Sequence, residues 1–163
     1  ENREVREPVI RNSTLFGFDI SAIQNCHTPA NIITPNGFTG EEACMLMQYA
    51  GMSHNSGIIG IYSYLPSLDK NEMTAKQISQ MAWYLIDGMQ KGKEEASLKN
   101  KDSFNQYHLV FSDMESNFLQ SKKTGRWWMQ LPDEKYISCS YNDYVLASQN
   151  EIPERWLRAV ERS

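Results

Sequence analysis

Two apolar segments, each followed by a helical pattern, constrain the fold of this chain most strongly. Residues 14–20 (TLFGFDI) and 57–64 (GIIGIYSY) are short apolar runs with aromatic and β-branched members, as is typical of buried strands. Residues 39–51 and about 71–90 carry apolar side chains at three- and four-residue steps, as is typical of helices with one packed face. The order strand, helix, strand, helix predicts a parallel sheet in an α/β protein.

Local signals define the first helix and the loop before it. Thr39 stands three residues before Glu42, which is the spacing of a capping box, and Gly51 is suited to end the helix. Residues 21–38 are rich in Asn, Thr, Pro and Gly and predict a long loop. Long loops inside compact domains are often functional.

The chain reads as a piece of a larger α/β protein. Two strands do not make a stable parallel sheet, so we expect the rest of the sheet to lie upstream. The opening residues ENREVREPVIRN lack an initiator Met and the apolar core of a signal peptide, which fits this expectation.

The second half has a different character. Residues 91–103 are polar and Lys-rich and predict an exposed linker. The expected elements after it are short strands at 107–111 and 126–131 and a terminal helix at 154–162 opened by Pro153. We therefore expect an α/β portion at 1–100 and an aromatic-rich extension at 101–163 that packs on it.

Composition excludes several classes of protein. The net charge of -4 argues against a nucleic-acid partner or an anionic membrane surface, which need a basic excess. No apolar run approaches the roughly 20 residues of a membrane span. The cysteines Cys26, Cys44 and Cys139 are scattered and odd in number, as expected of reduced thiols in a cytoplasmic protein.

Asp19 is the strongest candidate for a functional residue. It ends the first predicted strand and precedes the long loop, and ligands of parallel α/β sheets bind beyond the carboxyl ends of the strands. A carboxylate at that place suits a hard divalent cation. It also suits an Asx turn, in which Asp19 accepts backbone N–H bonds, and its position alone leaves both readings open.

Several segments between residues 8 and 92 resemble a known family in their order and spacing. They are FDISAI at 18–23, TPA at 28–30, TP at 34–35, GFT at 37–39, EA at 42–43, the strand at 57–64, Pro66, Asp69 and TA at 74–75. The first five resemble the last metal-binding motif of the ureohydrolases, which include arginase, agmatinase and formimidoylglutamase. The others resemble the family's next segment, and the Trp-rich tail is similar to an extension of a formimidoylglutamase-like subgroup.

The resemblance implies the C-terminal portion of a three-layer α/β/α arginase-like domain. It further implies a dinuclear Mn²⁺ site at which a metal-bound water hydrolyses a C–N bond of a linear amidine or guanidine. Family members often assemble into rings, so a homo-oligomer is an expected partner. The family's upstream GGDH and DAHxD motifs do not occur in these 163 residues, so we do not expect this chain alone to bind Mn²⁺.

Departures from the family pattern concern the site itself. Asp19 matches the first Asp of the family's D-x-D pair, but Ser21 takes the place of the second, and a neutral hydroxyl is a poorer Mn²⁺ ligand. Ser63 takes the place of the Glu that grips the amidinium, which loses a charge-assisted bond of about 1.5–3 kcal/mol. We therefore expect a degenerate site, in an impaired metallohydrolase or in a non-catalytic relative used for binding or assembly.

Weaker candidates remain as alternatives. Cys26 and His27 are adjacent and could help to bind a metal such as Zn²⁺, although an ordinary loop Cys and His is the favoured reading, since two adjacent residues rarely supply two ligands to one ion. His54 is expected in a solvated loop, and His108 in a packed or hydrogen-bonded position. The tail aromatics could stack on a ligand or anchor the extension; they are Trp127, Trp128, Tyr136, Tyr141, Tyr144 and Trp156.

Overall fold

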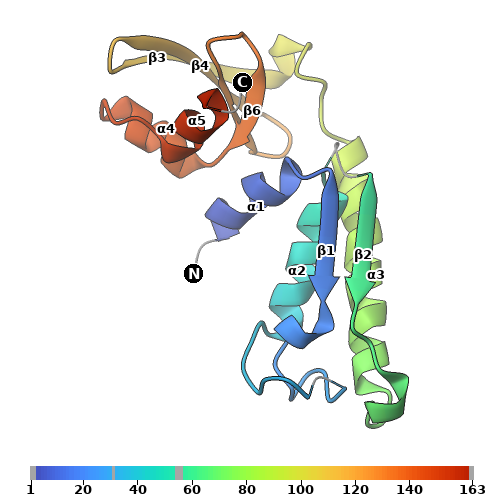
Figure 1. Cartoon of the computed structure of the whole chain (residues 1–163). Helices are drawn as coiled ribbons and strands as arrows, with labels where there is room; N and C mark the ends of the chain where they lie inside the picture. Colours follow the sequence, from blue (N-terminus) through green and yellow to red (C-terminus); the bar gives the residue numbers. More distant parts are fainter. Residues whose placement is uncertain (1–2, 31, 54–56, 162–163) are drawn as a thin grey trace. The chain divides into compact units, whose positions relative to one another are not determined.

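The computed structural model describes residues 3–30, 32–53 and 57–161, and its chain divides into two compact units (Figure 1). We call residues 10–94 the parallel unit, and residues 1–9 with 95–163 the antiparallel unit. Helix α1 (Arg3–Arg11) contributes residues to both. The protein is thus mixed α/β, with a small parallel sheet and a four-stranded antiparallel sheet.

The parallel unit is built on strands β1 (Leu15–Asp19) and β2 (Ile58–Tyr62), which pair in parallel as predicted. The register sets Asp19 beside Tyr62, so both strands end at the same edge. Alternate residues face opposite sides of the sheet, and Phe18 lies in the core. On the other side the Tyr62 ring lies over Gly17 and Gly60, where a larger residue would meet it.

Helices α2 (Gly40–Gly51) and α3 (Met73–Lys93) pack closely against each other. Thr39 and Glu42 form the predicted capping box at the start of α2, with Glu42 N–H donating to Thr39 Oγ1 at 3.1 Å. The close approach depends on small residues, because a Cβ on Gly88 would meet the backbone of Gln48. The shared core holds Ile23, Ala43, Leu46, Met47, Ala50 and Met81.

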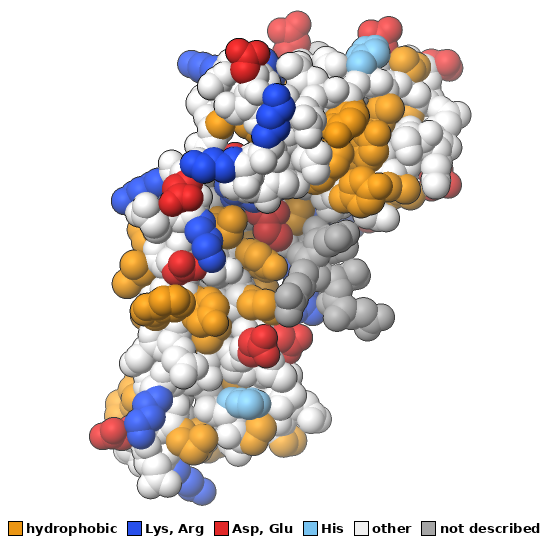
Figure 2. Space-filling model, turned by 180° about the vertical axis from the view of Figure 1, so that it is seen from behind, with side chains coloured by type: hydrophobic (Ala, Val, Ile, Leu, Met, Phe, Trp, Pro, Cys, Tyr) orange, Lys and Arg blue, Asp and Glu red, His pale blue; other side chains and the backbone are white. Residues whose placement is uncertain are grey.

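Hydrophobic side chains also reach the surface of both units, as Figure 2 shows from behind. On α3 the exposed ones are Trp83, Ile86 and Met89. Of the helices that the structure describes, none is long and apolar enough to cross a bilayer.

The antiparallel unit holds a sheet of the order β3-β4-β5-β6. Its strands are β3 (Phe104–Phe111), β4 (Met114–Ser121), β5 (Trp127–Gln130) and β6 (Tyr136–Cys139). β3 and β5 confirm the two predicted strands. A two-residue turn at Ser112 and Asp113, both with positive φ, joins β3 to β4, as in hairpins of type I′.

Helices α4 (Tyr141–Ser148) and α5 (Glu154–Val160) complete this unit. Ser140 and Asp143 form a capping box at α4, and Pro153 stands at the N-cap of the predicted terminal helix α5. Most of the tail aromatics pack on one another, with Trp127 stacked on Tyr107 at 5.3 Å and Trp156 against Phe111. They form a core inside their own unit. That the extension also packs on the α/β portion stays a prediction.

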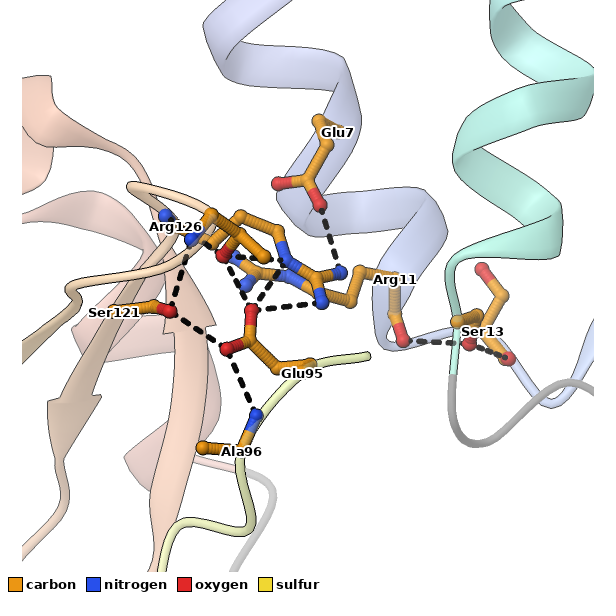
Figure 3. A network of polar contacts seen from close by, with 9 residues as sticks. Glu7, Arg11, Ser13, Glu95, Ala96, Ser121 and Arg126 are labelled. Atoms are coloured by element: carbon orange, nitrogen blue, oxygen red, sulfur yellow. Dashed lines mark hydrogen bonds and ion pairs between the residues drawn. The ribbon is translucent and has the colours of Figure 1, made fainter. Parts of the chain in front are cut away.

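In the antiparallel unit, Glu95 and Arg126 form a buried ion pair (Figure 3). Arg126 Nη2 and Nε lie 2.9 and 3.0 Å from Glu95 Oε2. The Glu95 side chain is 1% exposed and that of Arg126 is 7% exposed. Ser121 donates to Glu95 at 2.6 Å, and Thr124 donates to it as well. Residue 95 is therefore a structural anchor, although the sequence predicted an exposed linker at this place.

Other differences from the sequence prediction have local causes. The charged opening residues form α1, and α3 extends to Lys93, since basic residues are favourable in the last turn of a helix. α3 begins only at Met73, because Asn71 and Glu72 have positive φ. Strand β4 and helix α4 were not predicted, because β4 carries polar residues on much of its length and α4 is short.

Candidate functional site

The three residues singled out from the sequence meet at the carboxyl edge of the parallel sheet. Asp19 is the last residue of β1, Ser21 lies in the short 3₁₀ helix that follows, and Ser63 follows the last residue of β2. Parallel pairing in register is what brings Ser63 next to Asp19 across 44 residues of sequence.

Both carboxylate oxygens of Asp19 accept hydrogen bonds from these neighbours. Ser21 N–H donates to Oδ1 at 2.8 Å, so Asp19 is the N-cap of the 3₁₀ helix Ile20–Ala22. The Ser63 hydroxyl donates to Oδ2 at 2.9 Å. The Asx-turn reading of Asp19 is therefore confirmed, and its second carboxylate oxygen accepts from Ser63, which follows β2.

The backbone of Ser63 is unusual. Its φ of 66° lies in the left-handed region, which is uncommon for residues other than glycine. Such conformations cost of order 1–3 kcal/mol and persist only where the surrounding structure holds them. The hydrogen bond to Asp19 is one contact that holds this residue in place.

These donors lower the pKa of Asp19 below its ordinary value of 3.8. The largest cause is the hydrogen bond from the Ser21 side chain, followed by the Ser21 N–H and the Ser63 hydroxyl, and burial opposes them only weakly. The carboxylate is exposed to solvent and stays charged at neutral pH. The site is thus a solvent-facing anion held by neutral donors.

The donor set around Asp19 does not fit a dinuclear manganese centre. One carboxylate accepts from the Ser21 N–H and from the hydroxyls of Ser21 and Ser63, and hard divalent cations prefer several carboxylates. Within residues 3–30, 32–53 and 57–161, no three or more His, Cys, Asp or Glu side chains are grouped so that they could hold a metal ion. No reaction step through a metal follows from these residues.

The loop after Asp19 is held by a bridge between its own two ends and by a hydrogen bond to the start of α3. An isolated bridge joins Ile23 to Phe38, and Ala30 N–H donates to Thr74 Oγ1 at 3.1 Å. Asp69 in turn accepts from Thr74 N–H at 2.9 Å and from Ala75 N–H at 3.0 Å at the start of α3. The TA segment that supports the family resemblance thus contributes backbone donors for a helix cap.

The weaker candidates are placed as follows. The Cys26 thiol is exposed and lies 3.6 Å from Gln24 Oε1, and His27 is half-buried in the same loop. His54 lies outside the described residues. His108 is exposed and its Nδ1 lies 3.0 Å from Asn117 Oδ1, so the expectation of a hydrogen-bonded histidine is confirmed.

The antiparallel unit carries polar residues that sequence reasoning missed. His108, Asn117 and Gln130 form a hydrogen-bonded row across three strands, with Asn117 Nδ2 donating to Gln130 Oε1 at 2.7 Å. Glu95 and Arg126 were missed because 31 residues separate them. A single sequence does not reveal which distant charges pair, so no signal in the sequence identified this ion pair.

Comparisons with known proteins find a partial likeness among solved structures. No family model matches the sequence, and no curated protein matches it. Among solved structures, the chain is similar to formimidoylglutamase from Bacillus subtilis subsp. subtilis str. 168, with 23% identity and a TM-score of 0.45. The likeness covers 47% of this chain and 24% of that protein, so this chain spans about a quarter of its length.

Proposed function

We propose that this chain is a relative of the arginase and formimidoylglutamase metallohydrolases whose site no longer supports dinuclear manganese chemistry on linear amidines. The whole domain would be a three-layer α/β/α sheet of which the parallel unit is one part. The observation that carries the proposal is that both carboxylate oxygens of Asp19 accept hydrogen bonds from Ser21 and Ser63.

The chemistry of the two serines supports this proposal. A bridging carboxylate lowers the repulsion between two close Mn²⁺ ions, whereas the neutral hydroxyl of Ser21 does not. The hydroxyl of Ser63 also leaves a cationic amidinium without a carboxylate, and it occupies Asp19 Oδ2 instead. Both positions that the family uses for charge are neutral here.

A non-catalytic role in binding or assembly is the function that fits these residues best. The parallel unit keeps its packed core and its capped helices while the charged groups for hydrolysis are missing at positions 21 and 63. The competing proposal is an active amidine hydrolase that draws further ligands from elsewhere. A cytoplasmic location is part of the proposal, supported by the scattered and odd-numbered cysteines, which are typical of reduced thiols.

A manganese titration of the full-length protein, which would supply the upstream metal motifs that this chain lacks, tests the proposal, with release of urea or formamide from guanidines and formimidoyl compounds as a second readout. We expect fewer than two tightly bound manganese ions in the unchanged protein and no manganese-dependent hydrolysis at ordinary enzyme rates. Ser21→Asp adds the missing carboxylate and should raise Mn²⁺ affinity by about tenfold or more. Ser79→Asp adds the same charge on α3 and should leave the affinity unchanged.

Two results would contradict the proposal. Two firmly bound manganese ions in the unchanged chain would mean that Ser21 does not disable the site. Hydrolysis at ordinary enzyme rates would favour the competing proposal, in which ligands outside the trio complete the centre.

A further inference from the structure

Strand β3 lies at an edge of the antiparallel sheet and lacks the features that commonly protect edge strands from pairing with other chains. β3 is an edge strand of the sheet and is eight residues long. Its sequence, FNQYHLVF, contains no Lys, Arg, Asp, Glu or Pro. Edge strands are commonly protected by charges, by proline or by short length, because their open N–H and C=O groups pair with other chains. β3 has none of these devices, whereas the opposite edge strand β6 has four residues.

The residues whose backbone faces outward follow from the hairpin. The pair Phe111 and Met114 flanks the two-residue turn and therefore exchanges hydrogen bonds, and such pairs alternate along antiparallel strands. Lys122 N–H donates to Ser103 C=O at 3.0 Å, which confirms that odd-numbered residues face β4. The N–H and C=O groups of Gln106, His108 and Val110 thus point away from the sheet, as does the C=O of Phe104, whose N–H donates to Lys101 C=O.

We propose that β3 pairs antiparallel with β3 of a second copy of this chain, continuing the sheet across a two-fold axis. The register centred on Tyr107 sets Gln106 opposite His108 of the second copy, where both residues offer N–H and C=O groups. It also sets Phe104 opposite Val110 of the second copy, where Phe104 offers its C=O alone. No like charges meet in this register, since neutral residues fill the strand. An edge with a net charge would repel its own copy, so the neutrality of β3 favours a second copy as occupant.

Side chains on both faces suit this pairing. Tyr107 lies at the centre of the register and would stand opposite Tyr107 of the second copy, next to the ring of Trp127. On the other face Gln106, His108 and Val110 are exposed and at liberty to contact their counterparts. His108 already holds Asn117 through Nδ1, which leaves its Nε2 on the outer side of the ring as an acceptor toward a Gln amide.

Sedimentation of the full 163-residue chain over a range of concentrations tests the proposal. We expect a monomer–dimer equilibrium that His108→Pro weakens at least about tenfold, which is about 1.4 kcal/mol. Proline at this place removes an outward N–H and leaves the bonds to β4 intact. Gln106→Lys should weaken the dimer, because the two Lys side chains would be diagonal neighbours across the two-fold axis, and Gln106→Thr, its matched control, should keep it.

Amide hydrogen exchange measures the proposed pairing directly, because an effect of these substitutions on folding alone would not make amide protection depend on concentration. With rising concentration, the amides of Gln106, His108 and Val110 should become protected, while those of Tyr107 and Leu109 stay protected throughout. A chain that remains monomeric at every concentration overturns the proposal, as does a dimer that keeps its affinity in both His108→Pro and Gln106→Lys. Circular dichroism of each variant checks that the sheet is retained.

Discussion

Replacing Glu95 by Gln should strongly destabilise the antiparallel unit. Glu95 is almost fully buried and gives Arg126 its nearest negative charge, at 2.9 Å, whereas Glu7 Oε1 lies 3.9 Å from Nη1. Removing one partner of a buried pair leaves an uncompensated charge and costs about 3–5 kcal/mol. The hydroxyls of Ser121 and Thr124 donate to different oxygens of Glu95, so Gln keeps an acceptor for only one of them, and we expect the full range of about 3–5 kcal/mol.

Urea unfolding followed by tryptophan fluorescence measures this change. Trp127, Trp128 and Trp156 are buried in the antiparallel unit, whereas Trp83 is exposed on α3. A Trp83→Phe background therefore restricts the signal to the unit that contains Glu95. The free energy of unfolding is compared between the Gln variant and its parent at the same slope against urea.

The pH dependence provides a second measure of the same pair. Burial raises the pKa of Glu95, but hydrogen bonds from Ser121 and Thr124 and the charge of Arg126 outweigh it and lower the pKa below its ordinary value of 4.5. A carboxylate with a lowered folded pKa adds stability above pH 4.5, and this stability is lost as the pH falls through the folded value. The Gln variant should therefore lose less stability on acidification than its parent.

The matched control is Glu154→Gln. Glu154 pairs with Arg158 on the surface of α5, where the two side chains are 76% and 64% exposed. Exposed pairs of this kind contribute at most about 1 kcal/mol. The reasoning from burial is wrong if Glu95→Gln lowers the free energy of unfolding no more than Glu154→Gln does. It is also wrong if acidification lowers the stability of Glu95→Gln as much as that of its parent.

Three further outcomes follow from local contacts. Thr39→Ala removes the capping hydroxyl of α2 and should cost about 1 kcal/mol in urea unfolding. Ser63→Ala removes a donor to Asp19, so the pKa of Asp19 measured by NMR should rise toward 3.8. Gly88→Ala forces α3 away from the backbone of α2 and should cost about 1–3 kcal/mol, whereas Gly57→Ala, with only a 3.7 Å neighbour, should change little. An unchanged pKa or equal glycine variants would contradict these contacts.

The sequence by itself determined the elements whose signals are local. The capping box of Thr39 and Glu42, the two apolar runs and the periodicity of α3 depend on residues within one or two turns of each other, and all three were predicted correctly. The parallel pairing also followed, because a helix between two strands returns the chain in the same direction. Asp19 at a strand end was therefore identifiable before its neighbours were known.

Only the tertiary structure decided what surrounds Asp19. Ser63 reaches its carboxylate because the register of β1 and β2 aligns Asp19 with Tyr62, and nothing within residues 15–23 encodes that register. The same holds for Glu95, whose charge is buried only because β4 and β5 bring Ser121 and Arg126 to it. Short-range patterns specify backbone conformation, whereas the pairing of distant side chains depends on how whole elements pack. The hydrogen bond between Ser63 and Asp19 is a result of that packing.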